Sequence, residues 1–472
     1  MSKSRRDLLV GGAGSVTSRL IWLAAVPVVA RLYSPSDVGS WPLVTAVAAI
    51  IAVLGTLRLD AAIAITHYTK RAQTLVFATS ALTLTVSAVI ALLITFLPTV
   101  SSQVIGVDAN GPILYACPLF IVFTNLTAIL QAWLLRSKSI AAITIANAST
   151  PVVTVVALIL FGVIFGTSAG SFVAAYLCGL TAPFAAMSYA AVRTGLFKGP
   201  IPLSAGSVWR SIKLYKVYPT YSVPLSLVAV GSERLVQLWM ANAYSIEALG
   251  VLFLARQMLS SPISALTTPL QQVVFANLAR IPNPAQRIAF VLPILETAMA
   301  LAGIAIGLGW VLVPMIIPVL LGERFVTAAA YSQWLVLGMA LLLVSTWIDR
   351  LYDVARRVAL STYMNLAYYG LVAVSVIVAY AAKLPVVDFV ALYSLALFVG
   401  NAVFILVALR SAAFAWRDIG KSFAWLAIAV AASLGVAATA NLQLGGLAAV
   451  VVSAALALPV GAALLVRLLR AM

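Results

Sequence analysis

YSPSDVGSW occupies residues 33–41, and a closely similar stretch, YSIEALGVL, occupies residues 244–252. In both, Tyr-Ser is followed by a glycine six residues after the tyrosine, at Gly39 and Gly250, and the two copies stand 211 residues apart. A motif repeated over such a distance suggests that the chain contains two copies of one structural unit. The composition of the surrounding chain indicates what kind of unit this is.

The composition is that of a membrane protein. Of 472 residues, 63% are hydrophobic and only 9% are charged, whereas about a quarter of the residues of a soluble domain are charged. Apolar runs of about 20 residues recur along the chain, which is the length that a helix needs to cross the hydrocarbon core. We therefore expect an all-α polytopic membrane protein with about fourteen transmembrane helices.

The fourteen predicted spans follow from the apolar runs. The first is interpreted as an uncleaved helix, because its apolar region is too long for a signal peptide and further spans follow it. The ranges are 9–30, 39–65, 73–97, 112–133, 141–164, 170–192, 217–241, 249–275, 289–312, 326–348, 360–381, 387–409, 423–439 and 445–466.

The net charge of +17 is explained by topology. If the N-terminus is cytoplasmic, 22 of the 29 basic residues fall on the cytoplasmic side, four fall inside spans, and three (Arg31, Arg324 and Lys383) fall on the opposite side. Lys and Arg collect in short cytoplasmic loops. We therefore expect both termini in the cytoplasm, and we do not expect nucleic acid as a partner.

Both Tyr-Ser motifs are predicted in an external turn, after the first and the seventh span. We expect Ser, Pro and Gly to form this turn and Trp41 to lie near the lipid headgroups. An offset of six spans predicts two parallel six-helix bundles around a central cavity, the arrangement of transporters with parallel repeats. The predicted boundaries are 1–200 and 201–412 for the two bundles and 413–472 for an additional pair of helices.

The longest predicted cytoplasmic segment, residues 192–219, joins the two bundles. Its basic residues and its tryptophan could bind anionic lipid at the inner leaflet, or its charges could only hold the orientation of the neighbouring spans. The residues concerned are Arg193, Lys198, Trp209, Arg210, Lys213 and Lys216.

Seven ionisable residues lie inside predicted spans, where each would cost about 2.5–3.5 kcal/mol if it faced lipid. Most of them are therefore expected to face a polar space. The four arginines are candidate binding residues for an anionic substrate, although Arg58 and Arg256 could instead reach the headgroups. The three carboxylates are candidates for coupling to an ion, or for salt bridges between helices. The arginines are Arg19, Arg58, Arg234 and Arg256, and the carboxylates are Asp60, Glu233 and Glu296.

A dense charged group, WIDRLYDVARR, follows the tenth span and contains Asp349, Arg350 and Asp353. It could form a gate or simply end a helix. No cluster of His, Cys, Asp or Glu has the spacing of a metal site, and no phosphate-binding loop is present. We therefore predict no metal, no cofactor and no catalytic residue.

Three segments carry a resemblance to a known family. SVTSRLIWLAAVPVVARLYSPSDVGSW, LGTLRLDAAI and SERLVQLWMANAYSIEALGVLFLARQ resemble the polysaccharide flippases of the multidrug/oligosaccharidyl-lipid/polysaccharide exporter superfamily. The resemblance implies two six-helix bundles that move a lipid diphosphate-linked oligosaccharide between leaflets. The related lipid II flippases have cavity-facing arginines in their first and eighth helices, where Arg19 and Arg256 stand here. The chain lacks their dense basic cluster in the first helix.

The resemblance implies a flippase for undecaprenyl diphosphate-linked oligosaccharide in the bacterial inner membrane. It would work by alternating access in the synthesis of surface polysaccharide such as lipopolysaccharide, alongside membrane lipids, a glycan polymerase and other assembly proteins. One alternative is a multidrug or small-cation exporter of the same superfamily. A second is a membrane-embedded glycan polymerase or ligase, although the predicted external loops are short for such an enzyme. A non-transporting scaffold is a further alternative.

Overall fold

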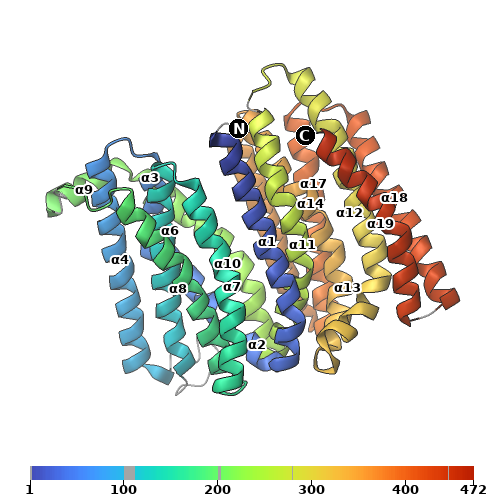
Figure 1. The fold of residues 1–472 in the computed structure, drawn as a ribbon, viewed down its shortest axis with the longest axis horizontal. Coiled ribbons are helices and arrows are strands. Elements are labelled where there is room, and N and C mark those ends of the chain that lie inside the picture. Colours follow the sequence, from blue (N-terminus) through green and yellow to red (C-terminus); the bar gives the residue numbers. More distant parts are fainter. Residues whose placement is uncertain (1–2, 100–111, 200–203, 279, 445, 472) are drawn as a thin grey trace. The chain divides into compact units, whose positions relative to one another are not determined.

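The computed structural model describes residues 3–99, 112–199, 204–278, 280–444 and 446–471, and every element in these ranges is a helix (Figure 1). Each predicted span falls mainly on helical residues. Eleven helices of the described chain are long and apolar enough to cross a membrane, so the all-helical fold is confirmed whereas the count of fourteen spans is not.

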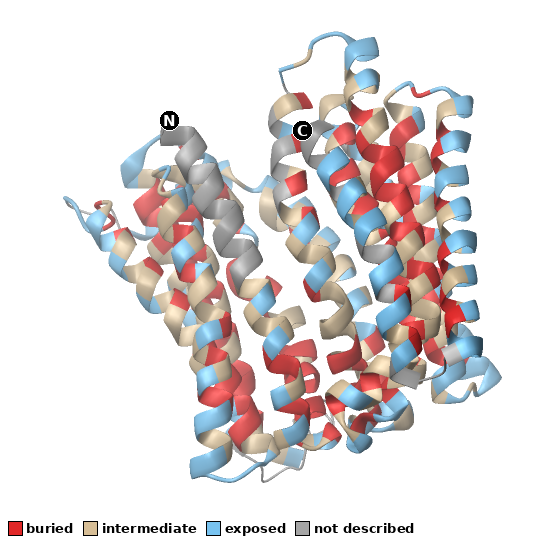
Figure 2. Cartoon of the chain, turned by 45° about the vertical axis from the view of Figure 1, so that its right-hand side comes forward, coloured by how far each residue is buried: buried red, intermediate tan, exposed pale blue. Residues whose placement is uncertain are grey.

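Contacts between residues divide the chain into two compact units. Unit 1 contains residues 1–25 and 32–250, and unit 2 contains residues 26–31 and 251–472. The boundaries predicted from the repeat, at residues 200 and 412, stay a prediction. Figure 2 shows that the buried residues of each unit lie mainly along helix faces that meet other helices, with exposed residues on the outer faces.

The helices of the first half of the chain, in order, are α1 (Lys3–Leu32), α2 (Pro35–Thr56), α3 (Leu59–Ile65), α4 (Thr69–Phe96), η1 (Pro112–Tyr115), α6 (Ala116–Arg136), α7 (Ile140–Ile164), α8 (Ala169–Arg193), α9 (Ala205–Leu214), η2 (Tyr218–Ser222), α10 (Val223–Trp239) and η3 (Met240–Tyr244). The second half contains α11 (Ile246–Leu278), α12 (Pro284–Leu321), η4 (Glu323–Phe325), α13 (Thr327–Ala340), α14 (Leu342–Ile348), α15 (Arg350–Val354), α16 (Val358–Ala382), α17 (Val386–Ser411), α18 (Trp416–Leu444) and α19 (Gly446–Ala471).

The repeated Tyr-Ser motif starts a helix in both copies. Ser34 caps α2: its side chain accepts a hydrogen bond from the Asp37 backbone N–H, and the Asp37 carboxylate accepts one from the Ser34 N–H at 3.1 Å. Pro35 occupies the first turn, where its missing N–H removes no helix bond. In the second copy the Ser245 hydroxyl accepts from the Ala248 N–H at 3.0 Å. The serines therefore satisfy backbone donors that the first turn leaves unpaired.

The two copies contact each other inside unit 1. A Cβ added to Gly39 would collide with the Ile246 carbonyl oxygen, and one added to Gly250 would collide with the Pro35 carbonyl oxygen. Pro35 and Ile246 are equivalent positions of the repeat, two residues after the tyrosine, so the contact is reciprocal. Reciprocal contacts are the mark of a two-fold relation. The glycines thus lie within the helices and serve close packing, whereas the sequence predicted them in the turn.

Tyr33 and Trp41 lie in the core of unit 1. The Tyr33 hydroxyl donates to the Leu158 carbonyl oxygen at 2.8 Å, and burial raises the pKa of this phenol, which keeps it a donor. The ring of Trp41 stacks on that of Tyr176 with centroids 4.7 Å apart, and Trp41 is only 7% exposed. Trp41 therefore packs against α8 inside the unit. Its depth relative to the lipid headgroups stays a prediction.

Unit 2 is built around close approaches between helices at small residues. Gly303 and Gly307 of α12 leave room for the backbone of α18, since a Cβ on either would meet α18 atoms. Gly338 of α13 likewise faces the Ser394 carbonyl oxygen of α17. Lipid gives little hydrophobic force for helix association, so spacing such as Gly-x-x-x-Gly supports packing by letting backbones approach.

We expect Gly39→Ala and Gly250→Ala each to lower the thermal unfolding temperature of the purified protein in detergent. The added methyl group must displace a carbonyl of the facing helix, and overpacking of this kind costs about 1–3 kcal/mol. Gly231→Ala in α10 is the matched control, because nothing lies within 4 Å of its added Cβ. Equal melting temperatures for all three variants would contradict the close contact of the two motifs.

Candidate functional site

Arg58 and Asp60 lie at an interruption of the second predicted span. α2 ends at Thr56, and Leu57 and Arg58 both take the left-handed backbone conformation, with φ of 48° and 58°. Two successive non-glycine residues in that region are uncommon and costly, and such strain occurs often at functional sites. Arg58 is exposed, whereas Asp60 is half-buried in α3, where its Oδ1 atom has no hydrogen-bond partner among the described residues.

Helix α10 carries Glu233 and Arg234 and is flanked by one π-helical turn at each end, η2 and η3. Such turns occur frequently at functional sites. Glu233 is exposed, while Arg234 is half-buried and donates to the Gln237 side chain at 3.1 Å. Only Val223 and Val236 are buried in α10. Glu233 and Arg234 therefore lie on a helix of which little surface is buried in the core.

Arg19 and Arg256 lie on α1 and α11, and both side chains are half-buried. A guanidinium offers five N–H donors in a planar arrangement that matches phosphate and carboxylate oxygens. A half-buried position in an apolar helix strengthens such contacts by lowering the local dielectric. Both residues are chemically suited to bind an anion, and their role in substrate binding stays a prediction.

Glu296 is the most buried of the predicted site residues, with 7% exposure. Its Oε1 atom lies 3.0 Å from Lys421 Nζ of α18, and its Oε2 atom lies 3.9 Å from an Arg467 nitrogen of α19. The two cations are more than half exposed, so one buried carboxylate joins α12 to both C-terminal helices. These contacts are those of a salt bridge between helices, and a role of Glu296 in ion coupling stays a prediction.

A cavity of about 320 Å³ adjoins this ion pair and is formed by α12, α18 and α19. Its polar end contains Glu296 and Arg467, and Ser433 is among the few other polar groups. The rest of the lining is apolar and includes Trp425, Leu456 and Val460. The cavity thus combines a long apolar wall with one charged end, a combination suited to an amphiphile.

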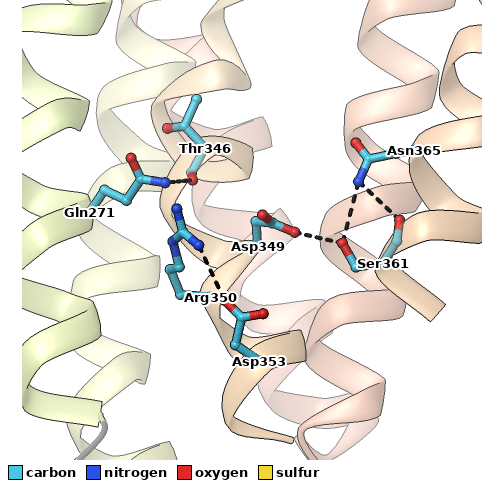
Figure 3. Close-up of polar contacts among 7 residues, drawn as sticks. All are labelled: Gln271, Thr346, Asp349, Arg350, Asp353, Ser361 and Asn365. Atoms are coloured by element: carbon cyan, nitrogen blue, oxygen red, sulfur yellow. Dashed lines mark hydrogen bonds and ion pairs between the residues drawn. The ribbon is translucent and has the colours of Figure 1, made fainter. Parts of the chain in front are cut away.

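The predicted gate residues take part in a polar group at one end of unit 2 (Figure 3). Arg350 pairs with Asp353 at 3.2 Å and lies over the Phe275 ring of α11. Asp349 accepts a hydrogen bond from the Ser361 hydroxyl of α16 at 2.8 Å. These contacts connect three helices, as a gate or a fixed helix end would, and leave both interpretations of Asp349, Arg350 and Asp353 open.

The sequence did not identify the two partners of Glu296, Lys421 and Arg467. Lys421 and Arg467 were counted with the cytoplasmic charges, because both stand near the predicted ends of spans. The available signal was the glycine pair at residues 303 and 307, about two to three turns after Glu296, which marks the face of α12 that another helix approaches. Among the described residues, no three His, Cys, Asp or Glu side chains lie together as metal ligands would.

We expect Glu296→Gln to lower the melting temperature by weakening the contact of α18 and α19 with α12. Because both cations are half exposed, the loss should be about 1 kcal/mol, and the exposed Glu323→Gln is the matched control. Lys421→Met should cost less stability in the Glu296→Gln background than in the wild type. Additive effects of the two substitutions would show that the ion pair contributes nothing.

Comparisons with known proteins agree with this architecture. A search of curated protein sequences found no match. Among solved structures, the lipid II flippase MurJ in an inward closed conformation aligns with a TM-score of 0.67, covering 95% of this chain and 98% of that one at 13% identity. An inward-facing MATE family transporter of the MOP superfamily aligns with a TM-score of 0.59, covering 85% of this chain and 95% of that one at 12% identity.

Residues 28–330 match the profile of the family described as polysaccharide biosynthesis protein. The match spans more than half of the chain and includes both Tyr-Ser motifs, and it confirms the family resemblance inferred from the sequence. The chain therefore belongs to the polysaccharide biosynthesis protein family, and it has the helical fold shared by the lipid II flippase and the MATE transporter.

Proposed function

We propose that the protein is a flippase that moves undecaprenyl diphosphate-linked oligosaccharide across the bacterial inner membrane by alternating access. The observation that carries this proposal is the combination of a polysaccharide biosynthesis family with a fold that matches a lipid II flippase over almost the full length of both chains. Such a protein transports a finished intermediate and catalyses no covalent step. The product would pass to a glycan polymerase and other proteins of surface polysaccharide assembly.

The arginines are the proposed binding groups for the diphosphate or for acidic sugars. Arg19, Arg234 and Arg256 are half-buried on apolar helices, where reduced exposure to water strengthens a contact with an anionic ligand. Arg58 is exposed at the strained interruption after α2. A guanidinium can hold a phosphate through two parallel hydrogen bonds, so these side chains suit a diphosphate better than an uncharged ligand.

The cavity beside Glu296 supports a lipid-linked substrate. Its apolar wall on α12, α18 and α19 could hold part of an isoprenoid chain, and Arg467 at its polar end would lie toward the charged headgroup. Because an isoprenoid chain in the bilayer is already surrounded by hydrocarbon, the wall would favour it by close packing and not by removal from water.

The carboxylates are the proposed coupling groups, and the charged group of α14–α16 is the proposed gate. Asp60 is half-buried, and its Oδ1 atom has no hydrogen-bond partner among the described residues, so this oxygen is free to accept a bond from a transported ion. Glu233 and Glu296 are the other candidates. Asp349, Arg350 and Asp353 connect α15 with α11 and α16, so a change in these contacts would reach three helices.

The second candidate function is the export of drugs or small cations. The structural match to a MATE transporter favours it. An exporter of cations needs a negatively charged interior, whereas the ionisable residues of the predicted spans are four arginines against three carboxylates. This balance favours an anionic substrate.

We expect proteoliposomes of the wild-type protein to move a fluorescent lipid diphosphate-linked glycan between leaflets. Arg19→Gln and Arg256→Gln should each slow transport about tenfold or more, because a hydrogen bond to a charged group contributes about 1.5–3 kcal/mol. The exposed Arg324→Gln is the matched control. Transport at the wild-type rate in the double variant would exclude these arginines from the substrate path.

Deletion of the gene should separate the two candidate functions. A flippase predicts loss of surface glycan and accumulation of the lipid-linked intermediate, with unchanged drug susceptibility. Hypersensitivity to cationic drugs in cells with normal surface glycan would overturn the proposal in favour of the exporter.

A further inference from the structure

A second cavity, of about 330 Å³, lies in unit 1 between the start of α4 and the short helix α9. Three of its lining side chains are cations, Lys70, Arg71 and Arg210, and the others are Tyr68, Thr74, Ser207 and Ser211. The lining contains no acidic residue. The proposed transport function does not use this cavity.

The chain around the cavity offers almost no counter-charge. Between Ala61 and Ser232 the only acidic residue is Asp108, which lies outside the described residues, and no described carboxylate forms an ion pair with Lys70, Arg71 or Arg210. The same stretch contains nine basic residues: Lys70, Arg71, Arg136, Lys138, Arg193, Lys198, Arg210, Lys213 and Lys216. The anion that balances this region must therefore come from outside the segment.

The two walls of the cavity are held in place by hydrogen bonds that do not involve its cations. Arg136 of α6 donates to the Thr66 and His67 carbonyl oxygens, at 2.7 and 3.0 Å, which fixes the turn before α4. The Thr66 hydroxyl donates to the hydroxyl of Tyr215, the residue just after α9, at 2.7 Å, and this bond joins the two walls. A site assembled in advance binds its ligand at a lower entropic cost.

The cations keep donors available for a ligand. Arg210 uses its Nε atom to donate to the Gly206 carbonyl oxygen at 3.1 Å, and Arg71 lies over the Tyr68 ring with its Cζ atom 5.2 Å from the centroid. Neither contact neutralises a charge. Terminal guanidinium nitrogens and a lysine ammonium are the donors that bind phosphate most strongly in proteins.

Helix α9 has the character of an interfacial helix. Trp209 and Leu214 are exposed on it by 66% and 56%, and Arg210 and Lys213 lie beside them. Basic side chains next to exposed tryptophan and leucine suit the boundary between headgroups and acyl chains. Helix α9 lies beside one end of α4 (Figure 1), and both segments are rich in basic residues. The positive-inside rule therefore assigns this end to the cytoplasmic leaflet, where anionic lipids concentrate.

We propose that this cavity binds the phosphate headgroup of an anionic membrane phospholipid, with the acyl chains lying along the exposed apolar residues of α9. The ligand is a bound lipid and not the transported substrate. Three cations without a carboxylate select a phosphodiester that has no positive group of its own, so phosphatidylglycerol should bind and phosphatidylcholine should not.

Native mass spectrometry of the full chain in neutral detergent tests the proposal by counting bound lipids during titration with phosphatidylglycerol or phosphatidylcholine. Arg71→Gln with Arg210→Gln should weaken phosphatidylglycerol binding about thirtyfold, the effect of two cations near an anionic headgroup at about 1 kcal/mol each. Lys138→Gln with Arg193→Gln removes two exposed charges outside both the cavity and α9, and should change binding less than about twofold. The charge-conserving pair Arg71→Lys with Arg210→Lys should retain most of the binding.

Three outcomes would overturn the proposal. Equal losses in the cavity pair and the control pair would show a diffuse surface charge. Equal affinity for the two phospholipids would show that the site does not recognise the headgroup. Displacement of the lipid by inorganic phosphate at similar concentration would show that the site binds a small anion. Melting temperatures of all variants are measured in parallel, and if the glutamine pair is unfolded, the lysine pair and the two-lipid comparison still decide.

Discussion

The reciprocal contact between the two Tyr-Ser motifs limits what α2 and the start of α11 can carry where they meet in unit 1. Gly39 faces the Ile246 carbonyl and Gly250 faces the Pro35 carbonyl, with no room for a side chain at either glycine. Two helix N-termini can approach this closely only if their first backbone donors are satisfied locally, and Ser34 and Ser245 satisfy them. The serine and the glycine of the motif therefore serve one purpose, which explains why both recur at the same spacing.

Small residues also allow two helices to approach closely elsewhere in the fold. In lipid the hydrophobic effect does little to join helices, so close backbone approach and dispersion must hold them together. Gly303 and Gly307 let α18 approach α12, and Glu296, which pairs with Lys421, lies about two to three turns before them on α12. Within unit 2, α18 is thus held against α12 by glycine packing, and Glu296 of α12 adds partly exposed ionic contacts with both α18 and α19.

The fold was largely predictable, because span length and hydrophobicity are strong signals that need no tertiary information. Its irregularities were not. Leu57 and Arg58 interrupt an apolar run that reads as one helix, and the burial of Trp41 against Tyr176 depends on tertiary packing. The candidate site was predictable only as a set of ionisable residues in apolar helices. The partners of Glu296 could not be identified, since the glycines at 303 and 307 mark a packing face of α12 but not which helices pack against it.

The basic residues show most clearly which distinction the sequence alone cannot make. Counted together, they fit the positive-inside rule, and nothing in the count distinguishes Lys421 from Arg210. In the structure Lys421 lies against a buried carboxylate, whereas Arg210 shares a cavity with two further cations and no acid. A cation with an internal partner stabilises the fold, and a group of cations without one attracts an anion from outside. The same topological signal therefore contains two functional classes, and only the arrangement of carboxylates in space separates them.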